Sequence, residues 1–75
     1  MIRTALLRLA AERAAGKTFC PSEVARELAE TGWRDLMPEV RAVAEGLVQA
    51  GQLRCWQGGQ PAWPLSARGP IRLSR

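Results

Sequence analysis

Hydrophobic residues recur three or four positions apart in three stretches of the chain, which is the spacing of a helix face. The first stretch predicts a helix over residues 2–14 with an apolar face of Ile2, Ala5, Leu6 and Leu9. The second begins at Pro21, a favoured first helical residue, and its apolar face consists of Val24, Ala25 and Leu28. The third begins between Asp35, the predicted N-cap, and Pro38, and it ends at Gly51. Its core-facing residues are Val40, Val43, Ala44 and Leu47.

A strand-like pattern follows the third helix. Residues 53–57 alternate apolar and polar side chains, and residues 60–63 return after Gly58-Gly59, a pair suited to a hairpin turn whose backbone needs positive φ. This register sets Cys55 opposite Ala62 and Arg54 opposite Trp63. The outward face of the hairpin is then predicted to hold Arg54, Trp56, Pro61 and Trp63.

The order of these elements predicts the fold class. Three helices followed by a β-hairpin indicate a mainly α domain of the winged-helix type, in which a three-helix helix-turn-helix core carries a wing. The length of 75 residues supports one compact core, so residues 1–75 are expected to form a single domain. We expect residues 17–19 to make at most an edge β-bridge, the tail 69–73 to dock near Leu7, and Trp33 to lie in the core.

Composition narrows the functional classes. No apolar run approaches the ~20 residues that cross a bilayer, and arginines interrupt the apolar positions at the N-terminus. We therefore expect a cytoplasmic protein with no membrane partner. The chain has no histidine, so Ser–His and Cys–His nucleophile pairs are impossible, and no glycine-rich phosphate loop is present. We expect no enzyme activity, no catalytic residue, no metal and no cofactor.

The two cysteines leave two interpretations open. Cys20 is predicted at a helix N-terminus, where the helix dipole can lower the pKa of a thiol, and Cys55 lies on the hairpin that approaches it. A redox-switched regulator is one interpretation. The other is a pair of small buried thiols, because free cysteine behaves as a small hydrophobic residue. The absence of a disulfide pattern favours reduced thiols.

The charge is unevenly distributed. Residues 1–51 hold seven basic and seven acidic side chains, whereas residues 52–75 hold four arginines and no acid, which accounts for the net charge of +4. Ten of the eleven basic residues are arginine, the better bidentate phosphate ligand. A basic C-terminal third suits a polyanionic partner, although a solvated arginine-rich surface would have the same composition.

The candidate nucleic-acid contacts lie on the third helix and on the wing. On the helix, only Arg41 and Gln49 carry side chains that read base edges, and Arg41 has an alternative partner in Glu45. On the wing, arginine and tryptophan form a face that can contact phosphates and stack on bases, unless Arg54 and Trp63 form an internal cation–π pair. The candidate residues are Arg41, Gln49, Arg54, Trp56, Trp63, Arg68 and Arg72.

A second functional class uses the same scaffold without binding DNA. The face formed by Pro38, Ala42 and Gly46 admits close approach of another helix, and Trp56 and Trp63 are candidate anchors for a protein partner. Double-stranded DNA and a protein partner therefore both stay open as ligands, and the oligomeric state stays open as well. Weak sequence preference with phosphate contacts led by the wing is the expectation for nucleic acid.

Three segments also resemble a known family. They are residues 20–26 (CPSEVAR), residues 33–41 (WRDLMPEVR) and residues 69–73 (GPIRL). Together they resemble a small bacterial family of unknown function that is placed structurally among winged-helix DNA-binding-like domains. The resemblance covers nearly the whole chain. It implies the winged-helix fold and assigns no functional residue.

Overall fold

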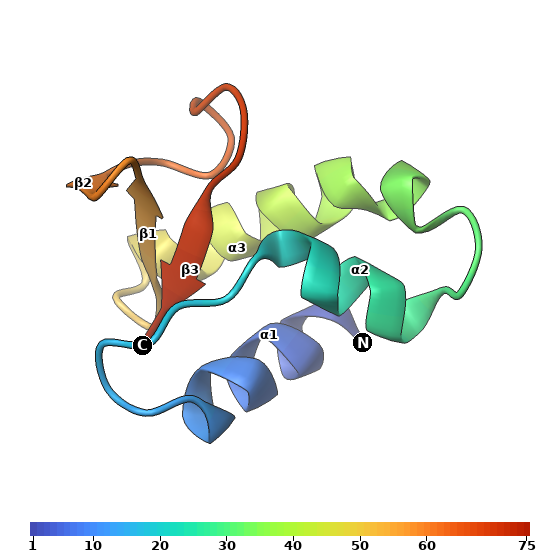
Figure 1. Ribbon diagram of the computed structural model, residues 1–75, viewed down its shortest axis with the longest axis horizontal. Helices are drawn as coiled ribbons and strands as arrows, with labels where there is room; N and C mark the ends of the chain where they lie inside the picture. The colour runs from blue at the N-terminus through green and yellow to red at the C-terminus, as the bar shows by residue number, and fades with distance from the viewer.

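Three α-helices come first in the chain, and a small antiparallel sheet follows them in a computed structural model that describes residues 1–75. The helices are α1 (Ile2–Glu12), α2 (Pro21–Leu28) and α3 (Met37–Gln49), with a 3-10 helix η1 (Trp33–Leu36) directly before α3. The strands are β1 (Arg54–Gln57), β2 (Gln60–Pro61) and β3 (Arg72–Ser74). Figure 1 shows the sheet at one end of the helical layer. No helix combines the length and apolar character that crossing a bilayer requires.

The start of α2 is fixed by a capping box, and this confirms the predicted first residue. The Cys20 backbone N–H donates to Glu23 Oε2 at 2.9 Å, and Pro21 occupies the first helical position. Arg13 Nη2 donates to the other oxygen of the same carboxylate at 2.6 Å. Burial raises the pKa of Glu23, but the Cys20 N–H and the Arg13 guanidinium together outweigh it and lower the pKa below its ordinary value.

The start of α3 differs from the prediction, because Asp35 does not cap it. Gly32 takes a left-handed conformation with φ of 71°, and the chain then winds through η1 into α3 without a side-chain cap. Asp35 lies inside η1, where its backbone N–H binds the Gly32 carbonyl at 3.0 Å. Pro38 falls in the first turn of α3, as predicted.

The prediction of Trp33 as a core residue holds in part. The side chain is half-buried and packs against the core, but it is not one of the fully buried residues. The guanidinium carbons of Arg26 and Arg34 are each 4.4 Å from the centroid of its ring, so two cations cover its exposed part.

The sheet has the strand order β2-β1-β3, so the main partner of β1 is the C-terminal strand. The turn at Gly58-Gly59 is confirmed, with φ of 57° and 80°, and Gln57 pairs with Gln60 as predicted. The returning strand is only two residues long, because the chain leaves the ladder after Ala62 and turns at Trp63–Ala67. Arg54 consequently pairs with Ser74 and not with Trp63.

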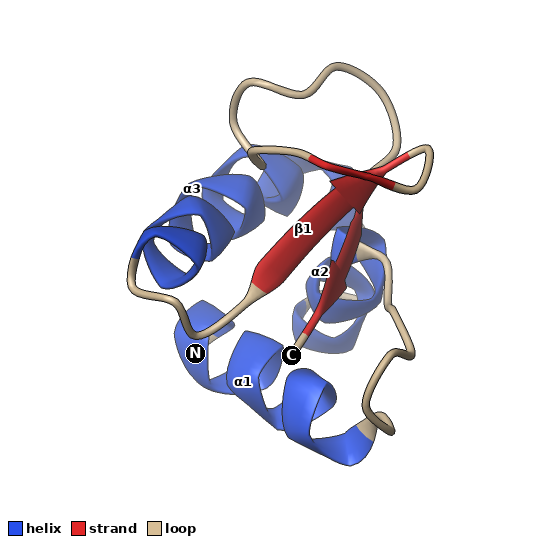
Figure 2. Ribbon diagram, turned by 90° about the vertical axis from the view of Figure 1, so that its left-hand side faces the viewer, coloured by secondary structure: helices blue, strands red, loops and turns tan.

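The tail docks, as predicted, and it does so as strand β3. Ile71 is 1% exposed and Leu73 is fully buried. Phe19 and Leu73 form an isolated bridge with two backbone hydrogen bonds of 2.8 Å, so the predicted edge bridge is confirmed. Figure 2 shows β1 and β3 side by side next to the helices, with the long loop that precedes β3 arching above them. The core contains Ala5, Leu6, Leu9, Ala10, Phe19, Val24, Ala25, Val40, Ala44, Leu47, Leu53, Cys55, Ile71 and Leu73.

Candidate nucleic-acid interface

The alternation of β1 separates the core from an outward basic face. Leu53 and Cys55 are 3% and 4% exposed and belong to the core, whereas Arg54 is exposed and Trp56 is half-exposed. In the β1–β3 ladder, Trp56 pairs with Arg72. Because paired residues of an antiparallel ladder point to the same side, the outward face brings arginines from two strands next to one tryptophan.

These side chains line a hollow of about 410 Å³ between the sheet and the loop that joins α1 to α2. We call it the basic hollow. Its lining contains three arginines and no acid, and consists of Gly16, Thr18, Arg54, Trp56, Gly59, Arg72, Ser74 and Arg75. The hollow therefore concentrates positive charge beside an aromatic ring.

Hydrogen bonds hold most of this hollow in place. Trp56 Nε1 donates to Ser74 Oγ at 3.0 Å. Arg72 Nε donates to Thr18 Oγ1 at 2.9 Å, and Arg72 Nη2 donates to the Thr18 carbonyl at 3.0 Å. Arg75 Nη2 donates to the Arg13 carbonyl at 2.9 Å. A guanidinium has five N–H donors, so Arg72 and Arg75 keep donors for an anion while neutral partners fix their position.

No arginine of the basic hollow forms an ion pair with an acidic side chain, although the charge of Arg72 contributes to the lowered pKa of Glu23. The ion pairs of the structure join Arg8 to Glu12 and Glu27, and Arg13 to Glu23. These ion pairs lie within α1, between α1 and α2, and between α2 and the loop that joins the two helices. Arg54 has no side-chain partner, which leaves its whole guanidinium in solvent. The ion pairs of the acidic side chains thus lie in the helical part of the molecule, and the arginines of the sheet form none.

Arg41 of α3 donates hydrogen bonds to three carbonyl groups of the loop that precedes β3. Its Nη1 donates to the carbonyls of Pro64 and Ala67 at 3.0 and 2.9 Å, and its Nη2 donates to the Gly69 carbonyl at 2.6 Å. The alternative pairing with Glu45 is wrong, because the Glu45 carboxylate accepts the backbone N–H of Leu65 at 3.1 Å. Both side chains hold the loop that precedes β3.

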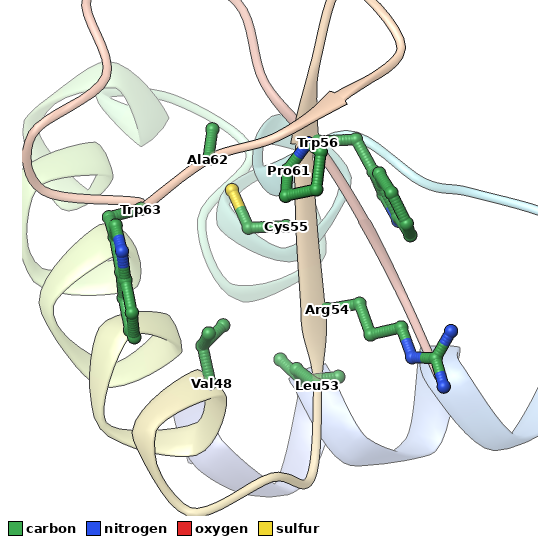
Figure 3. Close-up of a pocket in the computed structure, with 8 residues that line it drawn as sticks. All are labelled: Val48, Leu53, Arg54, Cys55, Trp56, Pro61, Ala62 and Trp63. Atoms are coloured by element: carbon green, nitrogen blue, oxygen red, sulfur yellow. The ribbon is translucent and has the colours of Figure 1, made fainter.

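The predicted cationic–aromatic face is divided by β1. Figure 3 shows Arg54 and Trp56 on one side of the strand and Trp63 on the other, next to Val48 of α3. The Arg54–Trp63 cation–π pair is therefore absent, because the shortened β2 never sets these residues opposite each other. Arg68 and Gln49 are exposed and lie outside the basic hollow, at the loop before β3 and at the end of α3.

An apolar hollow of about 310 Å³ opens on the Trp63 side of β1. Trp63 is 49% exposed at its edge, and Leu65, which follows in the chain, is 56% exposed. Val48 and Ala62 lie on the same side (Figure 3), and the lining also includes Arg54 and Trp56, which this hollow shares with the basic hollow. The exposed indole of Trp63 and this mostly apolar lining form a second surface, whose chemistry differs from that of the basic hollow.

Both cysteines are free thiols. Cys55 is buried, and burial raises the pKa of its thiol. Cys20 is half-buried at the N-cap of α2, and its sulfur accepts the hydroxyl hydrogen of Ser22 at 3.0 Å. The interpretation as buried thiols therefore holds fully for Cys55 and in part for Cys20.

Sequence reasoning missed Arg75, Ser74 and Thr18 as parts of the basic hollow. The alternation from Ile71 to Ser74, with apolar residues at every second position, is a strand signal that would have found β3. The contribution of Thr18 arises from a contact between residues 54 positions apart, which no local pattern reveals.

Comparison with known proteins places the chain in a family. A search of curated proteins finds no match. A family model described as "Protein of unknown function (DUF3253)" matches residues 1–75, in agreement with the resemblance to a family of unknown function. Since the match spans the whole sequence, the chain belongs to the family described as Protein of unknown function (DUF3253).

Proposed function

We propose that the chain is a winged-helix protein that binds nucleic acid through the basic hollow, by phosphate contacts with weak sequence preference. The observation that carries the proposal is the convergence of Arg54, Arg72 and Arg75 around Trp56 in a hollow that no acidic side chain lines. Phosphate contacts by arginine supply most of the non-specific affinity of proteins for nucleic acid.

The arrangement of the elements supports the winged-helix part of the proposal. Three helices precede an antiparallel sheet, and the segment before α2 joins that sheet through the Phe19–Leu73 bridge. The wing then corresponds to residues 58–71, which separate β1 from its main partner β3 and include the short strand β2.

The outward surface of α3 favours recognition of nucleic acid by shape and charge over direct recognition of base edges. A recognition helix presents donors and acceptors to base edges in the major groove. Here Arg41 and Glu45 bind the loop before β3. The outward residues Pro38, Ala42 and Gly46 carry no hydrogen-bonding side chain, and only Gln49 is left for a base edge.

The test is a titration of fluorescein-labelled duplex DNA at several salt concentrations. Each phosphate contact contributes about 0.9 to the slope of log K against log salt. Arg54→Ala with Arg72→Ala is expected to weaken binding to all sequences alike and to reduce this slope by up to about two. The control pair Arg3→Ala with Arg34→Ala removes the same charge from α1 and η1, outside the basic hollow, and is expected to leave the slope unchanged.

Absence of salt-sensitive binding to any nucleic acid would overturn the proposal and favour protein docking. That second function is supported by Trp63, which lines the apolar hollow and is 49% exposed, and by Leu65, which follows it in the chain and is 56% exposed. Trp63→Ala distinguishes the two, because it removes an anchor of the docking surface and leaves the basic hollow intact. Nucleic-acid affinity unchanged by Trp63→Ala is the result expected for the proposed function.

A further inference from the structure

We infer that the basic hollow accommodates one unpaired base against Trp56, with the adjoining phosphates on its arginines, so that the preferred ligand is single-stranded nucleic acid. The inference rests on the proposed function and specifies its ligand. It follows from the position of the indole, the dimensions of the hollow and the placement of the charges.

The indole of Trp56 is held as a fixed platform. Its Nε1 hydrogen bond to Ser74 Oγ ties the ring across the β1–β3 pair, and its half-exposed surface lines the hollow. A ring already held in place loses little rotamer freedom when a base stacks on it. Stacking of a base on an aromatic side chain contributes about 1–3 kcal/mol per base and tolerates any base.

The dimensions favour a single nucleotide unit. The hollow measures about 410 Å³, within the range of about 300–1,000 Å³ typical of small-ligand sites. Gly16 and Gly59 lie at its edge, and no atom lies within 4 Å of the position where a Cβ would stand on either, so the edge is open. Inside a duplex both faces of a base are covered by its stacked neighbours, and an unpaired base alone presents a face to Trp56.

The three arginines lie around the indole ring of Trp56, an arrangement that suits a single nucleic-acid strand with one base turned toward the ring. Arg72 is the cross-strand partner of Trp56, Arg54 precedes it by two positions on the same strand face, and Arg75 follows β3. Phosphates on either side of a stacked base would therefore each meet a guanidinium. A polyglutamate chain would satisfy the arginines but has no flat ring for the indole.

The experiment compares three probes of about ten nucleotides, a length within the 4–16 nucleotides that small single-strand-binding folds cover. They are single-stranded DNA, an abasic deoxyribose-phosphate strand of equal charge, and duplex DNA. Trp33→Phe with Trp63→Phe leaves Trp56 as the sole fluorophore. Single-stranded DNA is expected to bind more tightly than the other probes and to quench Trp56, whereas the abasic strand is expected to bind without quenching.

Variants at position 56 separate stacking from charge. Trp56→Leu is expected to weaken binding of single-stranded DNA about 5- to 150-fold, the equivalent of 1–3 kcal/mol, and to leave the abasic strand and the salt slope unchanged. Trp56→Phe retains a ring and is expected to restore most of the affinity. Circular dichroism of each variant establishes that it folds, and an unfolded Trp56→Leu leaves the quenching and probe comparison as the test.

The outcomes distinguish the inference from the proposed function. Equal affinity for duplex and single strand, without quenching of Trp56 and with a steep salt slope, would overturn the single-strand inference alone. Binding of polyglutamate as tight as that of single-stranded DNA would also overturn it. Failure of every nucleic-acid probe to bind in a salt-dependent way would overturn the proposed function as well.

Discussion

Replacement of Arg41 by alanine distinguishes a structural arginine from a base-reading one. Arg41 belongs to α3, which would be the recognition helix in the proposed winged-helix arrangement, yet its guanidinium donates to the carbonyls of Pro64, Ala67 and Gly69. The loop that precedes β3 is thus attached to α3 mainly through this side chain and through Glu45. Arg41→Ala is expected to destabilise the protein and to leave nucleic-acid binding by the folded protein intact.

The magnitude follows from the exposure of the three carbonyls. Gly69 is exposed, so water replaces the lost donor there, whereas Pro64 is buried and Ala67 is half-buried. A typical intramolecular hydrogen bond contributes about 1 kcal/mol net, and the two protected bonds therefore contribute about 2 kcal/mol. For a domain of this size, a loss of that extent lowers the unfolding temperature by roughly 8–16 °C.

Thermal unfolding followed by circular dichroism measures this loss, and Arg68→Ala is the matched control. Arg68 is exposed on the same loop and makes no ion pair, so its replacement is expected to change the free energy of unfolding by no more than about 0.5 kcal/mol. An Arg41→Ala protein of unchanged stability that loses preference for one duplex sequence would refute the reasoning and indicate a conventional recognition helix.

Two further predictions concern ionisable groups. Glu23→Ala removes the capping box of α2 and is expected to cost about 1 kcal/mol at neutral pH. Folding lowers the pKa of Glu23, so its ionised carboxylate stabilises the fold above the ordinary pKa of 4.5, and this contribution is lost as the pH falls through the lowered pKa. The difference in the free energy of unfolding between wild type and Glu23→Ala is therefore expected to shrink over that range. Urea unfolding at several pH values measures this difference, and a difference that stays constant with pH would contradict the assignment. For the thiols, iodoacetamide at pH 8 followed by mass spectrometry is expected to label Cys20 before Cys55, whose pKa is raised by burial; equal rates would contradict this order.

Local sequence patterns predict the helices and the turn, but they do not predict features that depend on contacts between residues far apart in the sequence. Pro21 locates the first residue of α2, and Gly58-Gly59 locate the turn. The length of β2 depends on how the chain turns after Ala62, and the identity of the main partner of β1 depends on β3, which lies 15 positions beyond the end of β1. Neither is encoded in the neighbouring residues.

The same distinction explains the candidate site. Arg54, Trp56 and Arg72 were predicted as contacts from charge and composition, and they do line one hollow. Trp63 is predicted on the same hairpin face as Arg54 and Trp56, and Arg41 at the flank of the outer face of the third helix, but tertiary contacts direct Trp63 to the apolar hollow and Arg41 to the loop before β3. A charged side chain that is predicted on an outer helix face can instead bind a loop, because the sequence pattern does not reveal the path of that loop.

The most direct test of the central claim is the location of the bound nucleic acid on the protein. Backbone amide chemical shifts of isotopically labelled protein, recorded during a titration with single-stranded DNA, provide that location residue by residue. We predict that the largest changes fall on residues 16–18, 54–57 and 72–75, which surround the basic hollow. Changes concentrated on the outward face of α3, at Ala42, Gly46 and Gln49, with the sheet unaffected, would contradict the account.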